Sequence, residues 1–260
     1  MRSKVICDVC RIDFALRIYG VPPQTPQPFE KGRRKLLCML GMRMKKYDYV
    51  IFDFDGTVVD TGEGILKSLQ YAFEKQGREI PDLSDLKRFI GPPIHYSFVT
   101  YYNVREDDVQ NYIKSYRERY RQVGIYECEI YDGILDLLKK LRESGVKIGI
   151  ASSKPIGLIY DVMNYLKITD CFDAVVGTQF DDSNHPNKTD LVLQSMAELG
   201  AEDKSRVLMV GDRRYDLDGA AGAGVDSCGV MYGYGSREEF IEHNATYIAD
   251  TALDILKIVF

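Results

Sequence analysis

Hydrophobic and polar stretches alternate regularly from Tyr131 to the end of the chain. Some have apolar positions at helical spacing, and others are short apolar runs typical of buried strands. The predicted helices are residues 133–143, a segment after Pro155, residues 189–199 and a segment after Arg214. The predicted strands are residues 146–151, 174–176, 206–210 and 227–231. This alternation predicts a parallel sheet with right-handed crossovers.

The first strand of this sheet is predicted at residues 49–53, well before the series. The residues between them, 61–130, are largely helical in pattern. Their predicted helices are residues 63–76, 83–90 and 106–122. Tyr112, Tyr116 and Tyr120 recur on one face of the last helix, which predicts a buried aromatic stripe.

We therefore expect an α/β fold with two domains. The core, residues 47–60 and 131–260, would be a Rossmann-like, doubly wound parallel sheet. Residues 61–130 would form a small inserted helical bundle, a cap above the carboxyl edge of the sheet. Parallel α/β sheets bind their ligands at that edge, so the cap would cover a site.

The sequence YVIFDFDGT at residues 49–57 places two aspartates directly after the first strand. Asp53 and Asp55 point to the same side of an extended backbone, and Gly56 permits a sharp turn. Two carboxylates about 4 Å apart repel by about 4 kcal/mol at an effective dielectric of about 20. A partly buried pair therefore predicts a bound cation or a raised pKa. The alternative is a solvated junction between a strand and a turn.

Further polar groups follow other predicted strands. They are Ser152, Ser153 and Lys154 after residues 146–151, Lys188 in a loop before a helix, and Gly211, Asp212 and Asp216 after residues 206–210. Taken singly, each has an ordinary explanation as a helix cap, a solvated lysine or a turn. Together, and always on the carboxyl side of a strand, they predict one site at the edge of the sheet.

Charge is distributed unevenly. The whole chain has a net charge of −5, which gives no reason to expect a nucleic-acid polymer or an anionic membrane as partner. Residues 1–46 nevertheless carry 11 Lys or Arg and 3 Asp or Glu, together with four prolines. We expect this basic leader to be disordered, or to lie upstream of the natural start at Met42 or Met44. A processed leader is the alternative.

The six cysteines show no spacing suggestive of a disulfide framework, which predicts a reducing, cytoplasmic location. Cys7 and Cys10 form one CxxC, but the nearest further candidate ligand is the single Cys38, so we expect no zinc site there. No apolar run is long enough to span a bilayer.

With these motifs, the chain resembles the haloacid dehalogenase superfamily, in particular its phosphatases with a helical cap after the first strand. The motifs are DFDGT at residues 53–57, Ser152, Lys188, and GDxxxD with Asp212 and Asp216. The resemblance covers residues 47–260. Residues 211–236 are most similar to bacterial members described as 5′-nucleotidase-like or phosphoglycolate phosphatase-like.

The resemblance implies that Asp53 attacks phosphorus to form an aspartyl-phosphate. Asp55 would protonate the leaving alkoxide and then activate water. It also implies Mg²⁺ as cofactor, held by Asp53, the backbone carbonyl of Asp55, and Asp212. Asp216 belongs to the same metal site, where it would orient the ligands. Lys188 would neutralise substrate charge.

Ser152 would act with these catalytic residues by holding phosphoryl oxygens. Further phosphate or substrate contacts are expected from Gly56, Thr57, Ser153, Lys154, Gly91, Pro92 and His95. The last three belong to a loop that resembles the substrate-specificity loop of the class. Lys154 could also be a solvated residue at a helix start, and His95 could simply be exposed.

The predicted function is Mg²⁺-dependent hydrolysis of a small phosphorylated metabolite, such as a 5′-nucleotide or a phosphoglycolate-like compound. Asp55 argues for phosphoryl transfer, because the dehalogenases of the superfamily lack this acid. A sugar phosphomutase on the same fold, or a catalytically silent phosphate- or metal-binding protein, is the alternative. Both a monomer and a homodimer are compatible with the sequence.

Overall fold

The computed structural model describes residues 45–92, 94–179 and 187–260. Nearly all of the predicted basic leader, with Cys7, Cys10, Cys38, Met42 and Met44, lies outside these ranges. Cys128, Cys171 and Cys228, which are described, are free thiols. Within the described ranges, no helix has both the length and the apolar character needed to cross a bilayer.

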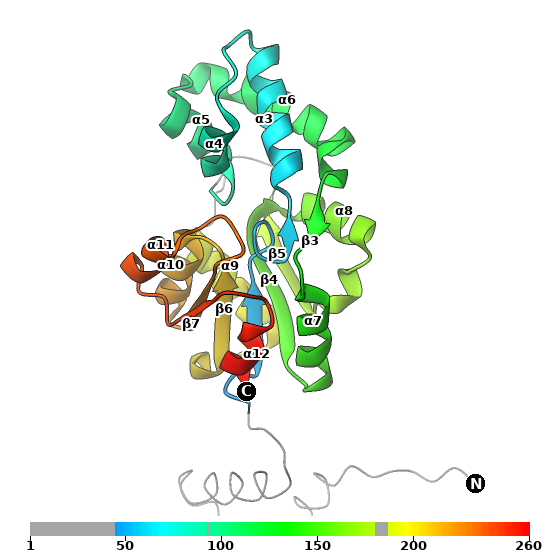
Figure 1. Cartoon of the computed structure of the whole chain (residues 1–260), viewed down its shortest axis with the longest axis vertical. Coiled ribbons are helices and arrows are strands. Elements are labelled where there is room, and N and C mark those ends of the chain that lie inside the picture. Colours follow the sequence, from blue (N-terminus) through cyan, green and yellow to red (C-terminus); the bar gives the residue numbers. More distant parts are fainter. Residues whose placement is uncertain (1–44, 93, 180–186) are drawn as a thin grey trace, which may run out of the picture. The chain divides into compact units, whose positions relative to one another are not determined.

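A six-stranded sheet with the order β5-β4-β1-β6-β7-β8 forms the centre of the core, and every pairing in it is parallel. Its strands are β1 (Tyr49–Phe52), β4 (Lys147–Pro155), β5 (Ala174–Thr178), β6 (Val207–Gly211), β7 (Asp226–Val230) and β8 (Tyr247–Ala249). β1 lies between β4 and β6, with Phe52 opposite Ile150 and Val210. The predicted α/β class and parallel sheet are thus confirmed (Figure 1).

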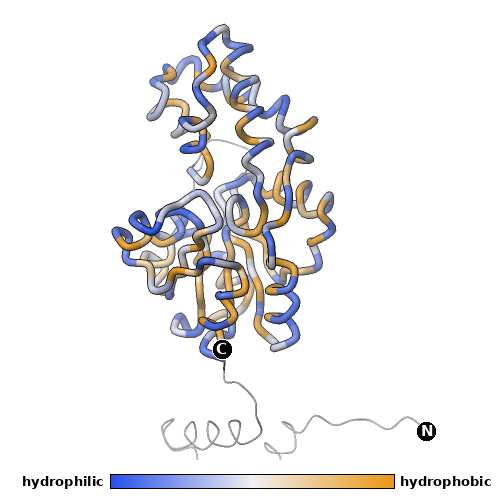
Figure 2. The backbone as a smooth tube through the Cα atoms, in the orientation of Figure 1, coloured by the Kyte–Doolittle hydropathy of each residue, from blue (hydrophilic) through white to orange (hydrophobic). Residues whose placement is uncertain are grey.

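Helices cover both faces of this sheet. They are α7 (Ile134–Glu143), α8 (Ile156–Leu166), α9 (Lys188–Leu199), α10 (Arg214–Ala223), α11 (Arg237–Glu242) and α12 (Asp254–Val259), with short 3-10 turns η3 (Thr169–Cys171) and η4 (Lys204–Arg206). Val50 and Phe52 of β1 pack with α7, α8 and α12, whereas Ile51 packs with α9 and α10 on the other face. A strand buried on both faces must be apolar throughout, which is why β1 has no polar position. Figure 2 shows hydrophobic residues concentrated along the strands.

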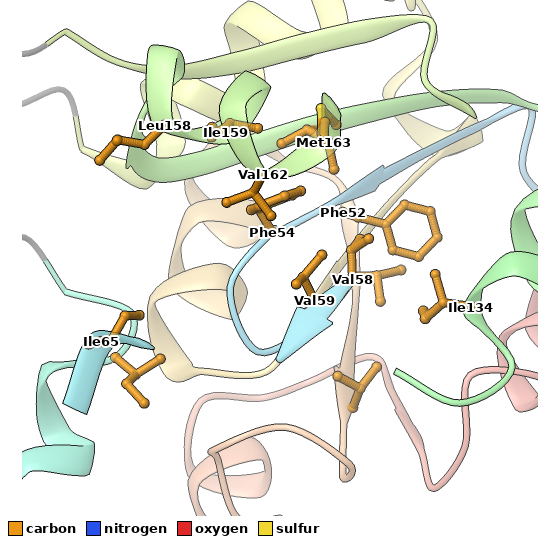
Figure 3. Close-up of a cluster of buried hydrophobic side chains, with 14 of the residues drawn as sticks. Phe52, Phe54, Val58, Val59, Ile65, Ile134, Leu158, Ile159, Val162 and Met163 are labelled. Carbon is orange, nitrogen blue, oxygen red and sulfur yellow. The ribbon is translucent and has the colours of Figure 1, made fainter. Parts of the chain in front are cut away.

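Residues next to Asp53 and Asp55 in the chain belong to the larger apolar cluster. Figure 3 shows Phe54 next to Val162 of α8, and Val58 next to Phe52 of β1. Phe54, Val58 and Val162 are all completely buried. The turn that carries Asp53 and Asp55 is therefore anchored in the core through Phe54, whose side chain points away from them on the pleated backbone.

Residues 61–130, which we call the cap segment, are helical. The elements are α3 (Gly62–Lys75), α4 (Leu83–Leu86), η1 (Lys87–Phe89), α5 (Ile94–Tyr102), α6 (Glu106–Gln122) and η2 (Gly124–Tyr126). Two short antiparallel strands, β2 (Val59–Asp60) and β3 (Glu129–Ile130), pair where the chain leaves for this segment and returns from it. Tyr112, Tyr116 and Tyr120 are buried, as the stripe predicted.

Some predicted elements differ from the structure. The predicted helix 83–90 is one α-turn followed by a 3-10 turn. The predicted loop around His95 is wrong in part, because α5 begins at Ile94 and places His95 in its first turn. This helix is apolar and aromatic on most sides, so its sequence has no clear stripe. Lys188 is the first residue of α9 rather than part of the loop before it.

Candidate active site

The functional side chains converge because of the strand order. Asp53 follows β1, Ser152 lies near the end of β4, and Asp212 follows β6. Since β1 lies between the other two parallel strands, their carboxyl ends meet at one edge of the sheet. All three side chains are buried.

Two of the predicted carboxylates pair with one lysine, and a third lies beside them. Lys188 Nζ lies 2.8 Å from Asp53 Oδ1 and 2.7 Å from Asp216 Oδ1. Carboxylate oxygens of Asp53, Asp212 and Asp216 all lie within 4.8 Å of one another. The Lys188 side chain is only 7% exposed, so its charge interacts with Asp53 and Asp216 rather than with solvent.

Small residues permit this close approach. A Cβ atom on Gly219 of α10 would lie 2.6 Å from Lys188 Cγ, so glycine leaves room for the lysine side chain. Gly56 has φ +83°, a left-handed conformation that L side chains rarely adopt, and a Cβ there would overlap the Asp212 carboxylate. Asp212 itself is held by the backbone N–H of Tyr234, which donates to Oδ2 at 2.8 Å.

Burial changes the acidity of this cluster. Loss of hydration, opposed by the charge of Lys188, raises the pKa of Asp53 to about 6. Burial, together with the charges of Asp216 and Asp53, raises the pKa of Asp212 well above its usual value. Burial disfavours the Lys188 ammonium, but attraction to Asp216 and Asp53 outweighs this and raises its pKa. The cluster carries more acids than its one lysine can neutralise.

These residues fit a hard divalent cation. Oδ1 of Asp53 and Oδ1 of Asp216 are buried and, within the described part of the chain, accept no hydrogen bond of regular geometry, although both lie in ion-pair range of Lys188. Carboxylate oxygens that face one another are the ligands that Mg²⁺ prefers. In this cluster Asp53, Asp212 and Asp216 could hold such an ion through their side chains.

The Asp55 side chain is not part of this cluster and pairs with a different lysine. Lys154 Nζ donates to both carboxylate oxygens of Asp55, at 2.9 and 3.0 Å, and Thr61 Oγ1 donates to Oδ1 at 2.7 Å. The Lys154 residue is 8% exposed. Lys154 is therefore not the solvated helix-start residue that the sequence left open.

A cavity of about 110 Å³ opens beside both groups. Asp53, Asp55 and a set of residues from the predicted phosphate and substrate contacts line it: Ser152, Ser153, Lys154, Gly91, Pro92 and His95. Its apolar wall includes Ile65, Leu69, Phe89, Tyr116 and Leu158. The cavity thus lies between the carboxyl edge of the sheet and the cap segment.

Thr57 is placed differently from its prediction, whereas His95 lines the cavity and also has a partner outside it. The Thr57 hydroxyl is buried and lies 3.4 Å from Asp212 Oδ1, so it supports the acid rather than facing the cavity. His95 Nε2 lies 3.0 Å from Glu106 Oε2, and the His95 side chain is 28% exposed. The exposed alternative for this histidine is therefore wrong, since it is half-buried and paired.

Sequence reasoning missed two residues at the site. Tyr120 was assigned to the aromatic stripe alone, yet its hydroxyl oxygen lies 2.7 Å from Lys154 Nζ. Arg213, inside the GDxxxD motif, donates from Nη1 to the backbone carbonyl of Ile90 at 2.8 Å. Nothing in the local pattern distinguishes either residue, because each partner is distant in sequence.

Comparison with known proteins agrees with this geometry. The profile of the haloacid dehalogenase-like hydrolases matches residues 50–230, which span the predicted motifs from Asp53 to Asp216. The chain belongs to this family, as a phosphatase.

Relatives of this phosphatase include bacterial proteins with different named activities. A 5′-nucleotidase of Pseudomonas aeruginosa is 36% identical over 80% of this chain and 93% of its own length. A protein of Mycobacterium tuberculosis named tyrosine-protein kinase PtkA is 32% identical over 79% of this chain and 69% of its own. The crystal structure of a predicted phosphatase from Clostridium acetobutylicum is 37% identical, with a TM-score of 0.77, and covers 82% of this chain and 98% of that one.

Proposed function

We propose that this phosphatase hydrolyses monoesters of small phosphorylated metabolites with Mg²⁺ and through an aspartyl-phosphate at Asp53. The observation that carries the proposal is the buried cluster of Asp53, Asp212 and Asp216 around Lys188, beside a cavity that also contains Asp55. It combines a nucleophile, excess negative charge for a cation, and a separate acid for the leaving group.

In the first half of the reaction, an oxygen of Asp53 attacks phosphorus and the bond to the ester oxygen breaks. Asp55 gives its proton to that oxygen, so that the alcohol leaves neutral. In the second half, Asp55 takes a proton from water, which attacks the phosphorus of the aspartyl-phosphate and restores the Asp53 carboxylate. Phosphate is released, and both acids return to their starting state.

The remaining residues manage charge and position. A dianionic phosphate must approach a carboxylate, so Lys188 and the cation must offset their repulsion. Asp53, Asp212 and Asp216 would hold Mg²⁺, which supplies Lewis-acid stabilisation of the phosphoryl oxygens when bound. Ser152 and Ser153 line the cavity next to Asp53 and can donate hydrogen bonds to those oxygens.

The cavity wall suggests where the leaving group binds. Gly91, Pro92 and His95 come from the cap segment, whereas Ser152 and Ser153 come from the core. A leaving group extending away from Asp53 would meet a surface that is partly apolar and partly polar. The name of the P. aeruginosa relative makes nucleoside 5′-monophosphates the first substrates to test, followed by phosphoglycolate.

The test is phosphate release with Mg²⁺ or EDTA across nucleoside monophosphates, phosphoglycolate, sugar phosphates and pyrophosphate. We expect release that requires both Mg²⁺ and Asp53, with Asp53→Asn as the blank. Sugar-phosphate isomerisation stimulated by a bisphosphate, without net release, would instead identify a mutase. No turnover of any substrate by folded, Mg²⁺-loaded protein would contradict the proposal and favour a silent binding protein.

A further inference from the structure

The cap segment contributes a side chain to the acid–base residue of the core. Lys154 Nζ has three hydrogen-bond partners: the two carboxylate oxygens of Asp55 and, at 2.7 Å, the hydroxyl oxygen of Tyr120 in α6. The same ammonium lies 4.7 Å from the centroid of the Tyr120 ring. An ammonium group has three donors, so these contacts use all of them.

Lys154 needs this third partner because it is buried. Its side chain is 5% exposed, and that of Asp55 is 13% exposed. A buried donor without an acceptor is unfavourable, so removal of the Tyr120 oxygen would leave the ammonium free to rotate toward another acceptor. Since the ammonium orients the Asp55 carboxylate, its rotation would move the carboxylate too.

Tyr120 is held firmly enough to act as such a support. It is fully buried, and its ring stacks on Tyr116 with centroids 5.4 Å apart and planes 12° apart. A Cβ on Gly124 would lie 2.8 Å from Tyr120 Cδ2, so the turn after α6 packs directly against the ring. The position of the phenol oxygen is therefore set by the fold of the cap segment.

The backbone of Lys154 is equally constrained. β4 changes register against β5 between Ala151 and Pro155, at the stretch that carries Lys154. Gly177 of β5 makes room for this irregularity, since a Cβ there would lie 2.7 Å from the Lys154 carbonyl oxygen. Both ends of the contact between Tyr120 and Lys154 thus belong to packed structure.

We infer that Tyr120 is a positioning residue that acts on Asp55 through Lys154, and that the cap segment thereby sets the orientation of the acid. The inference rests on the proposed role of Asp55 as general acid. It assigns to the cap segment a function in proton transfer in addition to its contribution to the cavity wall.

The test compares leaving groups. The kcat/KM value reports the steps up to phosphoryl transfer, and 4-nitrophenolate leaves without a proton whereas an alkoxide requires one. Tyr120→Phe keeps the ring and removes the hydroxyl. With the best alkyl monoester we expect kcat/KM to fall about tenfold. This is a part of the roughly 10²–10⁴-fold rate enhancement that a general acid contributes. With 4-nitrophenyl phosphate we expect less than about a twofold fall. Tyr71→Phe, which also loses a hydroxyl from the cap segment, is the matched control.

A second variant tests the route through Lys154. In a Lys154→Met background, which itself should show the same dependence on leaving group, Tyr120→Phe should have no further effect. If Lys154→Met does not fold, Lys154→Arg replaces it, and the effect of Tyr120→Phe should then be smaller than in the wild type. The inference would be overturned if the effects of Tyr120→Phe and Lys154→Met on kcat/KM were fully additive. It would also be overturned if Tyr120→Phe lowered kcat/KM equally for both substrates, or for neither.

Asp55→Asn separates this inference from the proposed function. If Asp55→Asn loses far more activity on alkyl than on aryl monoesters but Tyr120→Phe does not, only the positioning role fails. If Asp55→Asn shows no dependence on the leaving group, its role as general acid fails, and the positioning role with it.

Discussion

The two charged clusters beside the cavity differ in their charge balance. Around Lys188, the buried carboxylates of Asp53 and Asp216 pair with one ammonium, and a third buried carboxylate, that of Asp212, has an oxygen within 4.8 Å of theirs. Around Lys154, a single carboxylate receives two hydrogen bonds from the ammonium and one from Thr61. The first cluster has negative charge left for a further cation, whereas in the second the lysine balances the charge of the single carboxylate.

This difference separates two tasks. A cluster with excess negative charge can recruit a metal, and burial makes its pKa values sensitive to whether the metal is present. A balanced, fully hydrogen-bonded pair instead holds one carboxylate in a defined orientation. The proposed nucleophile Asp53 belongs to the first cluster and the proposed acid Asp55 to the second, although the two are separated by a single residue.

The strongest test of the first cluster is Asp53→Asn. We expect activity to fall more than about a thousandfold, because the amide is a poor nucleophile and a poor metal ligand. The fold should be retained, since the change removes a buried charge. Phosphate release and circular dichroism measure the two effects, with the exposed Asp250→Asn as control. Substantial activity in a clean Asp53→Asn preparation would refute the role of nucleophile.

Mg²⁺ should stabilise the protein through the first cluster alone. At a concentration about 100 times Kd, binding adds about 2.7 kcal/mol to the free energy of unfolding, measured as a rise in Tm that EDTA reverses. Asp212→Asn should remove most of this rise, and Lys154→Arg should leave it unchanged. An equal loss in both variants would show that the two clusters are not independent.

The Mg²⁺ effect should also depend on pH. The pKa of Asp53 is raised to about 6, so below this value the metal must displace a proton. The rise in Tm should therefore be largest above about pH 7 and shrink as the pH falls through about 6. A rise that is independent of pH between about 5 and 8 would contradict the ligand assignment.

Arg213 should affect substrate binding more than chemistry. Its Nη1 donates to the carbonyl of Ile90, and its Nε lies 3.2 Å from Glu239, so it ties the residues before Gly91 and Pro92 to the core. For Arg213→Gln we expect KM to rise about three- to tenfold, the net value of one typical intramolecular hydrogen bond, with kcat within about twofold. Arg237→Gln, which loses an exposed ion pair, is the control. A fall in kcat alone would contradict this role.

The smallest expected effect lies outside both clusters, at the base of the cap segment. Arg119 donates to both carboxylate oxygens of Glu127, at 2.8 and 3.0 Å, and this lowers the pKa of Glu127 from 4.5. Glu127→Gln should cost about 1 kcal/mol in the free energy of unfolding at neutral pH.

The sign of the pH dependence follows from the direction of that shift. The folded pKa lies below the unfolded one, so the contribution is full above 4.5 and is lost as the pH falls through the folded value. We would measure the free energy of unfolding in urea for wild type and Glu127→Gln at about pH 7 and about pH 3.5. The difference between the two proteins should be smaller at about pH 3.5. A larger difference at the lower pH would contradict a stabilising ion pair between Arg119 and Glu127.

Much of the core could be predicted because its signals are local. Asp53 and Asp212 each follow a short apolar strand, and Ser152 follows the apolar residues 148–151 of β4. Parallel pairing then brings those ends together without further information. The prediction was weaker in the cap segment, where α5 was missed because its apolar residues surround the helix.

The sequence by itself determined the sheet, the side on which the polar residues gather, and the family to which the chain belongs. Only the tertiary structure decided that Asp53 pairs with Lys188 and Asp55 with Lys154. Tyr120 and Lys154 are 34 residues apart, and Arg213 and Ile90 are 123 apart. Such contacts depend on how the cap segment packs on the core, and no periodicity along the chain encodes that distance. The division of charge between the two clusters is therefore a property of the fold.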